Sequence, residues 1–459
     1  MLNPSRKHKQ ILAASRLRFV LAAAVAAATI AALVVTPRWS VPAQAGTAVP
    51  RAQKTSASRS SNGIEQVLRE SVGEKKLPGV VAMVAVGDRV TYQGAFGTRD
   101  TTKNVAMAAD TIFRIASMTK PVTSVAVMQL VESGRVKLDE PAATYAPELT
   151  QVQVLEEFDA STKEAKLRAP KTPPTVRQLL THTAGFAYEF FDPKMQAYAA
   201  SGAVPSMRLG GDDGFLKGPL MFDPGTRWEY GINTDWLGRI VEKVSGQDLE
   251  TYFRQHIFQP LGMNDTFFNV PAEKQARVVA LHVRQDDGSY VEPPPQPAQT
   301  VKFFSGGGGL NSTAGDYLKF ERMLVNGGTL GGKRLLKVET VAEMCRNQIG
   351  ELSLVQMTSL LPQLAKNPIR IPGSVDKFGL GFGINTKPVE GGRSAGSPSW
   401  AGIYSTYFWI DPARKTCAVI MMQLLPFSDD AAVATVEQFE RTVYASSAQS
   451  AAAGAAHTN

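Results

Sequence analysis

A serine and a lysine three residues apart, Ser117 and Lys120, form the first pair whose types and spacing could do chemistry. If a helix begins at Ser117, the two side chains lie on one face, about one turn apart. An ammonium group beside a serine hydroxyl lowers the cost of forming the alkoxide, and a desolvated lysine can itself accept the proton. The pair predicts nucleophilic catalysis, although a helix-capping serine and a solvated lysine produce the same pattern.

A group that moves the proton to and from the leaving group is also needed, and Tyr230 is the candidate. It follows a Pro-Gly turn and stands just before a helical pattern at residues 236–244. A phenol near an ammonium group ionises more readily and can act as a general base. The alternative is a core aromatic residue with its hydroxyl at the surface.

A second serine, Ser394, lies in Gly392-Arg393-Ser394-Ala395-Gly396, which fits the G-x-S-x-G nucleophile elbow. That elbow needs a strand before the serine, a helix after it, and an acid and a histidine downstream. Here Pro398 and strand-like sequence follow, and the one later histidine is His457, near the end of the chain. Ser394 is therefore rejected as the nucleophile.

Other chemistries find little support in the sequence. His182 is interpreted as a hydrogen-bonded residue at a helix end, because no recognisable carboxylate motif accompanies it. No His, Cys, Asp or Glu spacing indicates a metal, and residues 306–309, all glycine, lack the Lys-Ser/Thr of a phosphate loop. We expect no metal and no cofactor. Cys345 and Cys417 are interpreted as two small core residues that need not pair.

The elements that must position these residues suggest an α/β fold with an all-α insertion. Strand-forming runs occur at both ends of the chain, whereas its middle shows helical periods separated by Pro- and Gly-rich loops. The predicted division is an α/β domain from residues 63–116 and 300–446, and a mainly helical domain at 117–299. Residues 46–62 are expected to be a flexible linker and residues 447–459 a disordered tail.

The first 45 residues read as a secretory signal. Six of the basic residues and no acid lie there, so the rest of the chain carries only +2 of the net charge of +8. The basic net charge is therefore no argument for nucleic acid binding, and we expect none. An apolar run at 19–35 precedes small residues that predict cleavage after Ala45 and a periplasmic or secreted protein. The alternative is an uncleaved inner-membrane anchor at 19–35; with cleavage we expect no stable membrane association.

Taken together, the motifs resemble the serine β-lactamase superfamily, and the likeness runs from about residue 64 to residue 427. Within that superfamily the sequence is similar to class C β-lactamases and, more closely, to the family VIII carboxylesterases. The shared motifs, in order, are Ser117-x-x-Lys120, Tyr230 after Pro-Gly-x-x-Trp, the glycine run from Ser305 to Ala314, and Trp400-Ala401-Gly402. The resemblance implies a β-lactamase/penicillin-binding-protein transpeptidase-like fold, with an antiparallel sheet flanked by helices and a mainly helical second domain.

The same resemblance assigns roles. Ser117 would be the acylated nucleophile, Lys120 its activating partner, and Tyr230 the general base in acylation and deacylation. The oxyanion hole would be formed by the backbone N–H groups of Ser117 and Ile403.

Two departures bear on the substrate. Trp400 stands where class C β-lactamases have the lysine that helps to hold the substrate carboxylate. Ile232 stands where they have an asparagine, and Asn233 comes one residue later. We place Trp400, Gly402, Ile232 and Asn233 among the substrate-binding residues.

The expectation is a serine hydrolase for short-chain uncharged esters, with a small-molecule ester as its partner. A β-lactamase or D-alanyl-D-alanine carboxypeptidase is the alternative. An acyltransferase or amide hydrolase on the same residues, and a non-catalytic binding or sensor module, also stay open.

Overall fold

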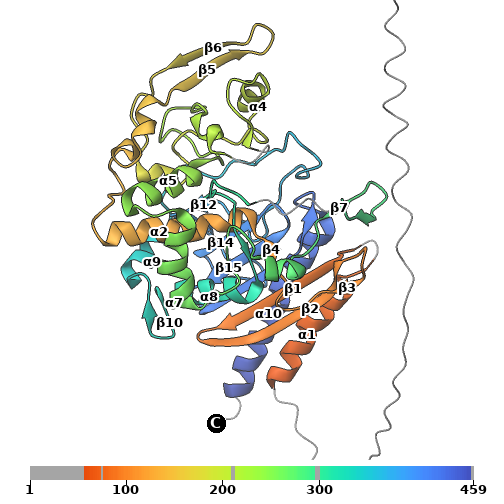
Figure 1. Ribbon diagram of the computed structural model, residues 1–459. Coiled ribbons are helices and arrows are strands. Elements are labelled where there is room, and N and C mark those ends of the chain that lie inside the picture. The colour runs from red at the N-terminus through yellow and green to blue at the C-terminus, as the bar shows by residue number, and fades with distance from the viewer. Residues whose placement is uncertain (1–55, 74–75, 208–211, 295–299, 456–459) are drawn as a thin grey trace, which may run out of the picture. The chain divides into compact units, whose positions relative to one another are not determined.

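The centre of the fold is an eight-stranded antiparallel sheet to which both ends of the chain contribute (Figure 1). The computed structural model describes residues 56–73, 76–207, 212–294 and 300–455. The strand order is β12 (Lys377–Phe378), β13 (Gly383–Asn385), β14 (Ser397–Gly402), β15 (Thr406–Asp411), β16 (Thr416–Met421), β1 (Gly79–Val86), β2 (Arg89–Asp100) and β3 (Val105–Ala106). The pairing of β1 with β16 joins the two ends of the chain.

Each central strand serves two hydrophobic cores, because successive side chains of a strand point to opposite faces. In β1, Val81 and Met83 belong to one core, whereas Val80 and Ala82 belong to the other. The central strands are therefore buried on both sides. This explains why β1, β15 and β16 are apolar along most of their length instead of alternating with polar residues.

Helices cover both faces of the sheet. Helices α1 and α10 lie side by side in Figure 1 and enclose one core, to which Ile64 and Val436 contribute. Helix α8 packs on β1 and β16 from the other face. The helices are α1 (Ser56–Glu70), α2 (Thr119–Glu132), α3 (Val176–Leu180), α4 (Pro193–Ala200), α5 (Asn233–Ser245), α6 (Leu249–Phe253), α7 (Gln259–Leu261), α8 (Ala314–Val325), α9 (Val338–Met344) and α10 (Asp430–Ala455). This arrangement confirms the predicted antiparallel sheet flanked by helices.

Four small sheets lie outside the central sheet in the described part of the chain. They join β4 (Phe113–Arg114) to β9 (Asn311–Ser312), β5 (Val154–Asp159) to β6 (Glu164–Arg168), β10 (Thr329–Leu330) to β11 (Lys333–Arg334), and β17 (Leu424–Leu425) to β7 (His282–Arg284) and on to β8 (Tyr290–Val291). The β5–β6 hairpin lies in the segment predicted to be mainly helical. Its strands are short and largely exposed, so they lack the apolar pattern by which a strand is recognised.

Two predicted boundaries are wrong. Helix α1 begins at Ser56, inside the predicted linker, and α10 continues to Ala455, through most of the predicted disordered tail. The tail is rich in alanine, the best helix former, and it extends a helix that is already anchored. The predicted leader, residues 1–45, lies outside the described residues. The division into two domains remains a prediction.

Among the described residues, no helix combines the length and apolarity needed to cross a membrane. Cys345 and Cys417 are both free thiols.

Candidate active site

Ser117 lies in a tight turn that the flanking strands hold in place. A 3₁₀ turn at Ala116–Met118 leads directly into α2, and the short β4–β9 pairing fixes the chain just before it. Ala116 has a φ of 42°, a left-handed conformation that is uncommon for a residue with a side chain. Such backbone strain is concentrated at functional sites, where the surroundings enforce it.

Lys120 is 1% exposed and donates three hydrogen bonds. Its Nζ lies 3.2 Å from Ser117 Oγ, 2.9 Å from Tyr188 OH and 2.7 Å from the carbonyl oxygen of Gly307. All three N–H groups of an ammonium are thereby satisfied. Lys120 therefore acts in this structure as a donor to the Ser117 hydroxyl, and the proton of that hydroxyl needs another acceptor.

Tyr230 is placed to be that group. It lines the same pocket as Ser117, and the Lys120 Nζ lies 4.6 Å from the centre of its ring. The indole Nε1–H of Trp400 donates to its hydroxyl oxygen at 3.0 Å. Tyr230 therefore has a cation over its ring and a hydrogen-bond donor at its hydroxyl.

Tyr188 is a further residue of the site, which the sequence alone did not indicate. Its hydroxyl accepts a hydrogen bond from Lys120, and its ring packs edge-on against Tyr230. Burial, with the charge of Asp235 as a further cause, raises the pKa of Tyr188 well above the usual range, so its phenol stays protonated. Its only signal in the sequence is a tyrosine three residues after the Leu179–Gly185 segment, which is too little to identify it.

The two predicted oxyanion-hole residues come together at the pocket. Ser117 and Ile403 both line it, and within the described residues neither backbone N–H donates to another protein group. Gly402 lies behind them: a Cβ there would be 2.2 Å from the carbonyl oxygen of Ile115. The glycine is thus needed for the close approach of β14 to the nucleophile turn.

Of the predicted substrate-binding residues, only Trp400 lines the pocket. Ile232 is buried immediately before α5. Asn233 is wholly buried and donates to His182 Nδ1 at 2.9 Å. The structure therefore corrects the placement of Ile232, Asn233 and Gly402 at the pocket. Ile232, just before α5, and Asn233, its first residue, are buried in the core. Gly402 packs against the backbone of Ile115. Burial, and next the charge of Lys120, lowers the pKa of His182, so it is a neutral structural partner.

The pocket beside Ser117 has a volume of about 430 Å³. None of the described residues that line it carries a charge. Its walls are Ala116, Ser117, Tyr188, Phe190, Phe191, Met207, Tyr230, Ser305, Gly307, Gly308, Gly309, Met357, Leu364, Ile369, Ile371, Trp400, Ala401, Ile403, Tyr404 and Phe427. An apolar pocket with a few convergent polar groups is typical of a small-molecule site.

Ser394 lies elsewhere, in the turn between β13 and β14. Its backbone N–H donates to Asp411, and the neighbouring Arg393 forms a buried ion pair with Glu440. Ser394 does not line the Ser117 pocket.

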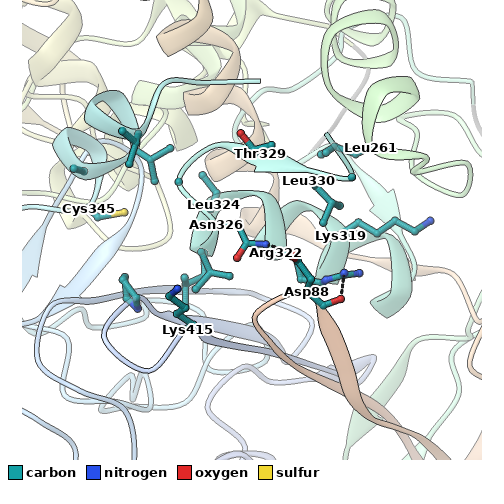
Figure 2. Close-up of a pocket in the computed structure, with 18 of the residues that line it drawn as sticks. Asp88, Leu261, Lys319, Arg322, Leu324, Asn326, Thr329, Leu330, Cys345 and Lys415 are labelled. Atoms are coloured by element: carbon teal, nitrogen blue, oxygen red, sulfur yellow. Dashed lines mark hydrogen bonds between the residues drawn. The ribbon is translucent and has the colours of Figure 1, made fainter. Parts of the chain in front are cut away.

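A larger cavity, of about 1080 Å³, also lacks the means for this chemistry. It lies beside the β1–β2 and β15–β16 turns, where Figure 2 shows Asp88 and Lys415. Its thiol nucleophile would be Cys345, but burial raises the pKa of that thiol to about 12. Within the described residues, no cluster of His, Cys, Asp and Glu could hold a metal ion.

Ser117, Lys120 and Tyr230 thus meet at one pocket, together with Tyr188 and Ile403. Residues 64–441 match the model of the family described as Beta-lactamase. The chain belongs to this family.

Three relatives illustrate the similarity. The chain is 31% identical over 405 residues to monacolin J acid methylbutanoyltransferase of Aspergillus terreus, with coverage of 83% of this chain and 95% of the relative. It is 30% identical over 360 residues to lovastatin esterase of Penicillium rubens, with coverage of 73% and 85%. The solved structure of a simvastatin synthase variant from Aspergillus terreus has a TM-score of 0.72 at 29% identity, with coverage of 84% and 98%. The β-lactamase fold predicted from the sequence is confirmed, and the protein is a serine hydrolase or acyltransferase of that superfamily.

Proposed function

We propose that this protein is a carboxylesterase that cleaves short-chain uncharged esters through an acyl-enzyme on Ser117. The uncharged pocket beside Ser117 is the observation that carries the proposal. A charged substrate group would lose its hydration there without gaining a partner, which is costly. Trp400 supports the same choice, because an indole cannot pair with the carboxylate of a β-lactam or a peptide.

The chemistry follows from the positions of the side chains. Tyr230, as the phenolate, takes the proton of Ser117 while Oγ forms a bond to the ester carbonyl carbon. The electron pair of the carbonyl moves to its oxygen, which the N–H groups of Ser117 and Ile403 hold. When this intermediate collapses, the bond to the alcohol oxygen breaks and the alcohol takes the proton from Tyr230. Water then attacks the acyl-enzyme in the same way and releases the acid.

Acyl transfer to an alcohol is a second candidate. The relative from Aspergillus terreus is named as a methylbutanoyltransferase, and that from Penicillium rubens as an esterase. Both activities use one acyl-enzyme, and they differ in whether water or an alcohol attacks it.

The first experiment measures p-nitrophenyl butyrate hydrolysis by the purified protein and by Ser117→Ala and Ser394→Ala. We expect Ser117→Ala to be inactive and Ser394→Ala to keep wild-type activity. A p-nitrophenyl ester whose acyl chain ends in a carboxylate should react at least about 100-fold more slowly, because the pocket offers it no cation. Equal rates for the two esters, or hydrolysis of a chromogenic cephalosporin in preference to both, would contradict the proposal.

A competing alcohol separates the two candidates. In the presence of 1-hexanol, a hydrolase releases mainly butyric acid, whereas an acyltransferase forms mainly hexyl butyrate. Gas chromatography of the products gives the ratio directly.

A further inference from the structure

Lys120 presents a problem of buried charge. Its ammonium group is almost fully buried, and its three acceptors are a serine hydroxyl, a phenol and a backbone carbonyl. No carboxylate of the described residues forms an ion pair with it. A buried ammonium without a counter-charge is unfavourable, so a nearby anion is expected to compensate it.

Asp235 is the acid that meets this need. It lies in the first turn of α5 and is 1% exposed. Its Oδ1 accepts hydrogen bonds from Ser305 Oγ at 2.6 Å and from the Gly307 N–H at 3.1 Å. Gly307 therefore joins the two charges, since its N–H donates to Asp235 while its carbonyl oxygen accepts from Lys120.

The glycines at 306–309 explain how the loop fits between α2, which carries Lys120, and α5, which carries Asp235. A Cβ at Gly307 would lie 2.4 Å from Asp235 Oδ2, and one at Gly306 would lie 2.8 Å from the carbonyl oxygen of Thr234. Thr123, one turn after Lys120, donates to the Gly306 carbonyl oxygen at 2.7 Å. The loop is thus fixed between α2 and α5 and cannot carry a side chain at either glycine.

We propose that Asp235 is a positioning residue, which supplies the counter-charge of Lys120 and aims the Gly307 carbonyl at its ammonium group. Asp235 does not line the Ser117 pocket and acts through the Ser305–Gly307 loop. The inference rests on Ser117 as the acylated residue under the proposed function, whichever ester is the substrate.

Tyr188, His182 and Tyr230 are titratable groups that lie around Asp235 and Lys120. Burial raises its pKa, while Lys120 and the bonds from Ser305 and Gly307 lower it. Its charge is felt at Tyr188, whose pKa it raises, and Lys120 acts on His182, which is held neutral. Tyr230 is the remaining ionisable group that faces Lys120.

A neutral residue at position 235 should shift the pH dependence in a defined direction. The pH profile of kcat/KM reports the ionisations of the site as a whole, and its rising limb marks the loss of the proton that attack by Ser117 requires. A buried negative charge beside the site opposes that loss. In Asp235→Asn the rising limb should move to lower pH by about one unit. We expect kcat at the optimum to fall about 10-fold or more, because Lys120 loses its counter-charge, while KM changes little.

The test compares pH profiles of p-nitrophenyl butyrate hydrolysis, with thermal unfolding to verify folding. Glu321→Gln is the matched control, because Glu321 is a buried carboxyl outside the site whose pKa burial raises well above the usual range. It should leave the profile unchanged. If Asp235→Asn does not fold, Asp235→Ser provides a smaller neutral residue that can still accept a hydrogen bond.

Each outcome decides the inference. If a folded neutral variant shows the rise of kcat/KM at the same pH as wild type, the inference is overturned, whether or not kcat falls. A purely structural role would change the rate without shifting the pH profile. A limb displaced to lower pH with reduced kcat supports it. Ser117→Ala in the same assay separates this result from the proposed function: if that variant hydrolyses the ester as fast as wild type, the proposed function fails first.

Discussion

Replacing Trp400 by phenylalanine would test whether its indole N–H supports catalysis. Trp400 Nε1 donates to the Tyr230 hydroxyl oxygen at 3.0 Å, and the two ring centres lie 5.2 Å apart. Phenylalanine keeps an aromatic ring against Tyr230 and Phe378 but removes this donor. The phenolate that takes the Ser117 proton would then lose one of its two stabilising contacts.

The expected magnitude follows from the type of bond. A hydrogen bond to a charged group contributes about 1.5–3 kcal/mol, against roughly 1 kcal/mol for a neutral pair. If the bond is strongest when Tyr230 is charged, Trp400→Phe should lower kcat/KM about 10- to 100-fold. The smaller ring also removes packing from the wall of the pocket, so KM is expected to rise moderately.

Trp409→Phe is a matched control on the neighbouring strand. Trp409 is also buried, and its indole N–H donates to Tyr444 OH at 3.2 Å, in the other core and away from Ser117. Both variants lose one Trp–Tyr hydrogen bond from the same sheet. We expect both to lower the unfolding temperature, but only Trp400→Phe to slow p-nitrophenyl butyrate hydrolysis. The reasoning is refuted if Trp400→Phe keeps kcat/KM within about twofold of wild type, or if both variants lose activity in parallel.

Three further predictions concern Tyr188, the Arg393–Glu440 pair and Glu229. Tyr188→Phe removes an acceptor from Lys120 and should lower kcat about 10-fold with KM unchanged, as steady-state kinetics would show; an unchanged kcat would exclude a role for its hydroxyl. Arg393→Met leaves Glu440 buried without its charged partner and should cost about 3 kcal/mol in urea unfolding without changing kcat in the native state. Burial raises the pKa of Glu229 to about 7, so its favourable contribution is complete below its unfolded value near 4.5 and is lost as pH rises through 7. Glu229→Gln should therefore unfold at a higher temperature than wild type at pH 8 and at nearly the same temperature at about pH 4.

The candidate site residues that could be predicted are those whose contacts are local in the sequence. Ser117 and Lys120 lie one turn apart on any helix, so their spacing alone brings them together. Tyr188 and Asp235 could not be found in this way. Their contacts with Lys120 and Gly307 cross 68 and 72 residues of sequence. The first needs the loop between α3 and α4 to reach α2, and the second needs the glycine loop to pack on α5.

The failure at Asn233 has a related cause. A polar residue soon after a catalytic tyrosine suggests a substrate contact, but the direction of its side chain is set by where α5 begins. The helix starts at Asn233 itself, and this turns the amide inward to His182 and the Phe186 carbonyl. A shift of one residue on a helix rotates a side chain by about 100°. A one-residue difference in loop length therefore moves a side chain from the pocket into the core.

The G-x-S-x-G string shows that the same letters can serve a structural purpose. Here the motif binds a carboxylate of its own chain: the backbone N–H and the guanidinium of Arg393 both donate to Glu440 on α10. A Cβ at Gly392 would lie 2.6 Å from Glu440 Oε1, so this glycine lets the turn close on the acid. In an elbow the small residues make room for a helix that follows the serine; here they make room for a helix that arrives from the end of the chain. The sequence around the motif distinguishes the two, because a strand rather than a helix follows Ser394.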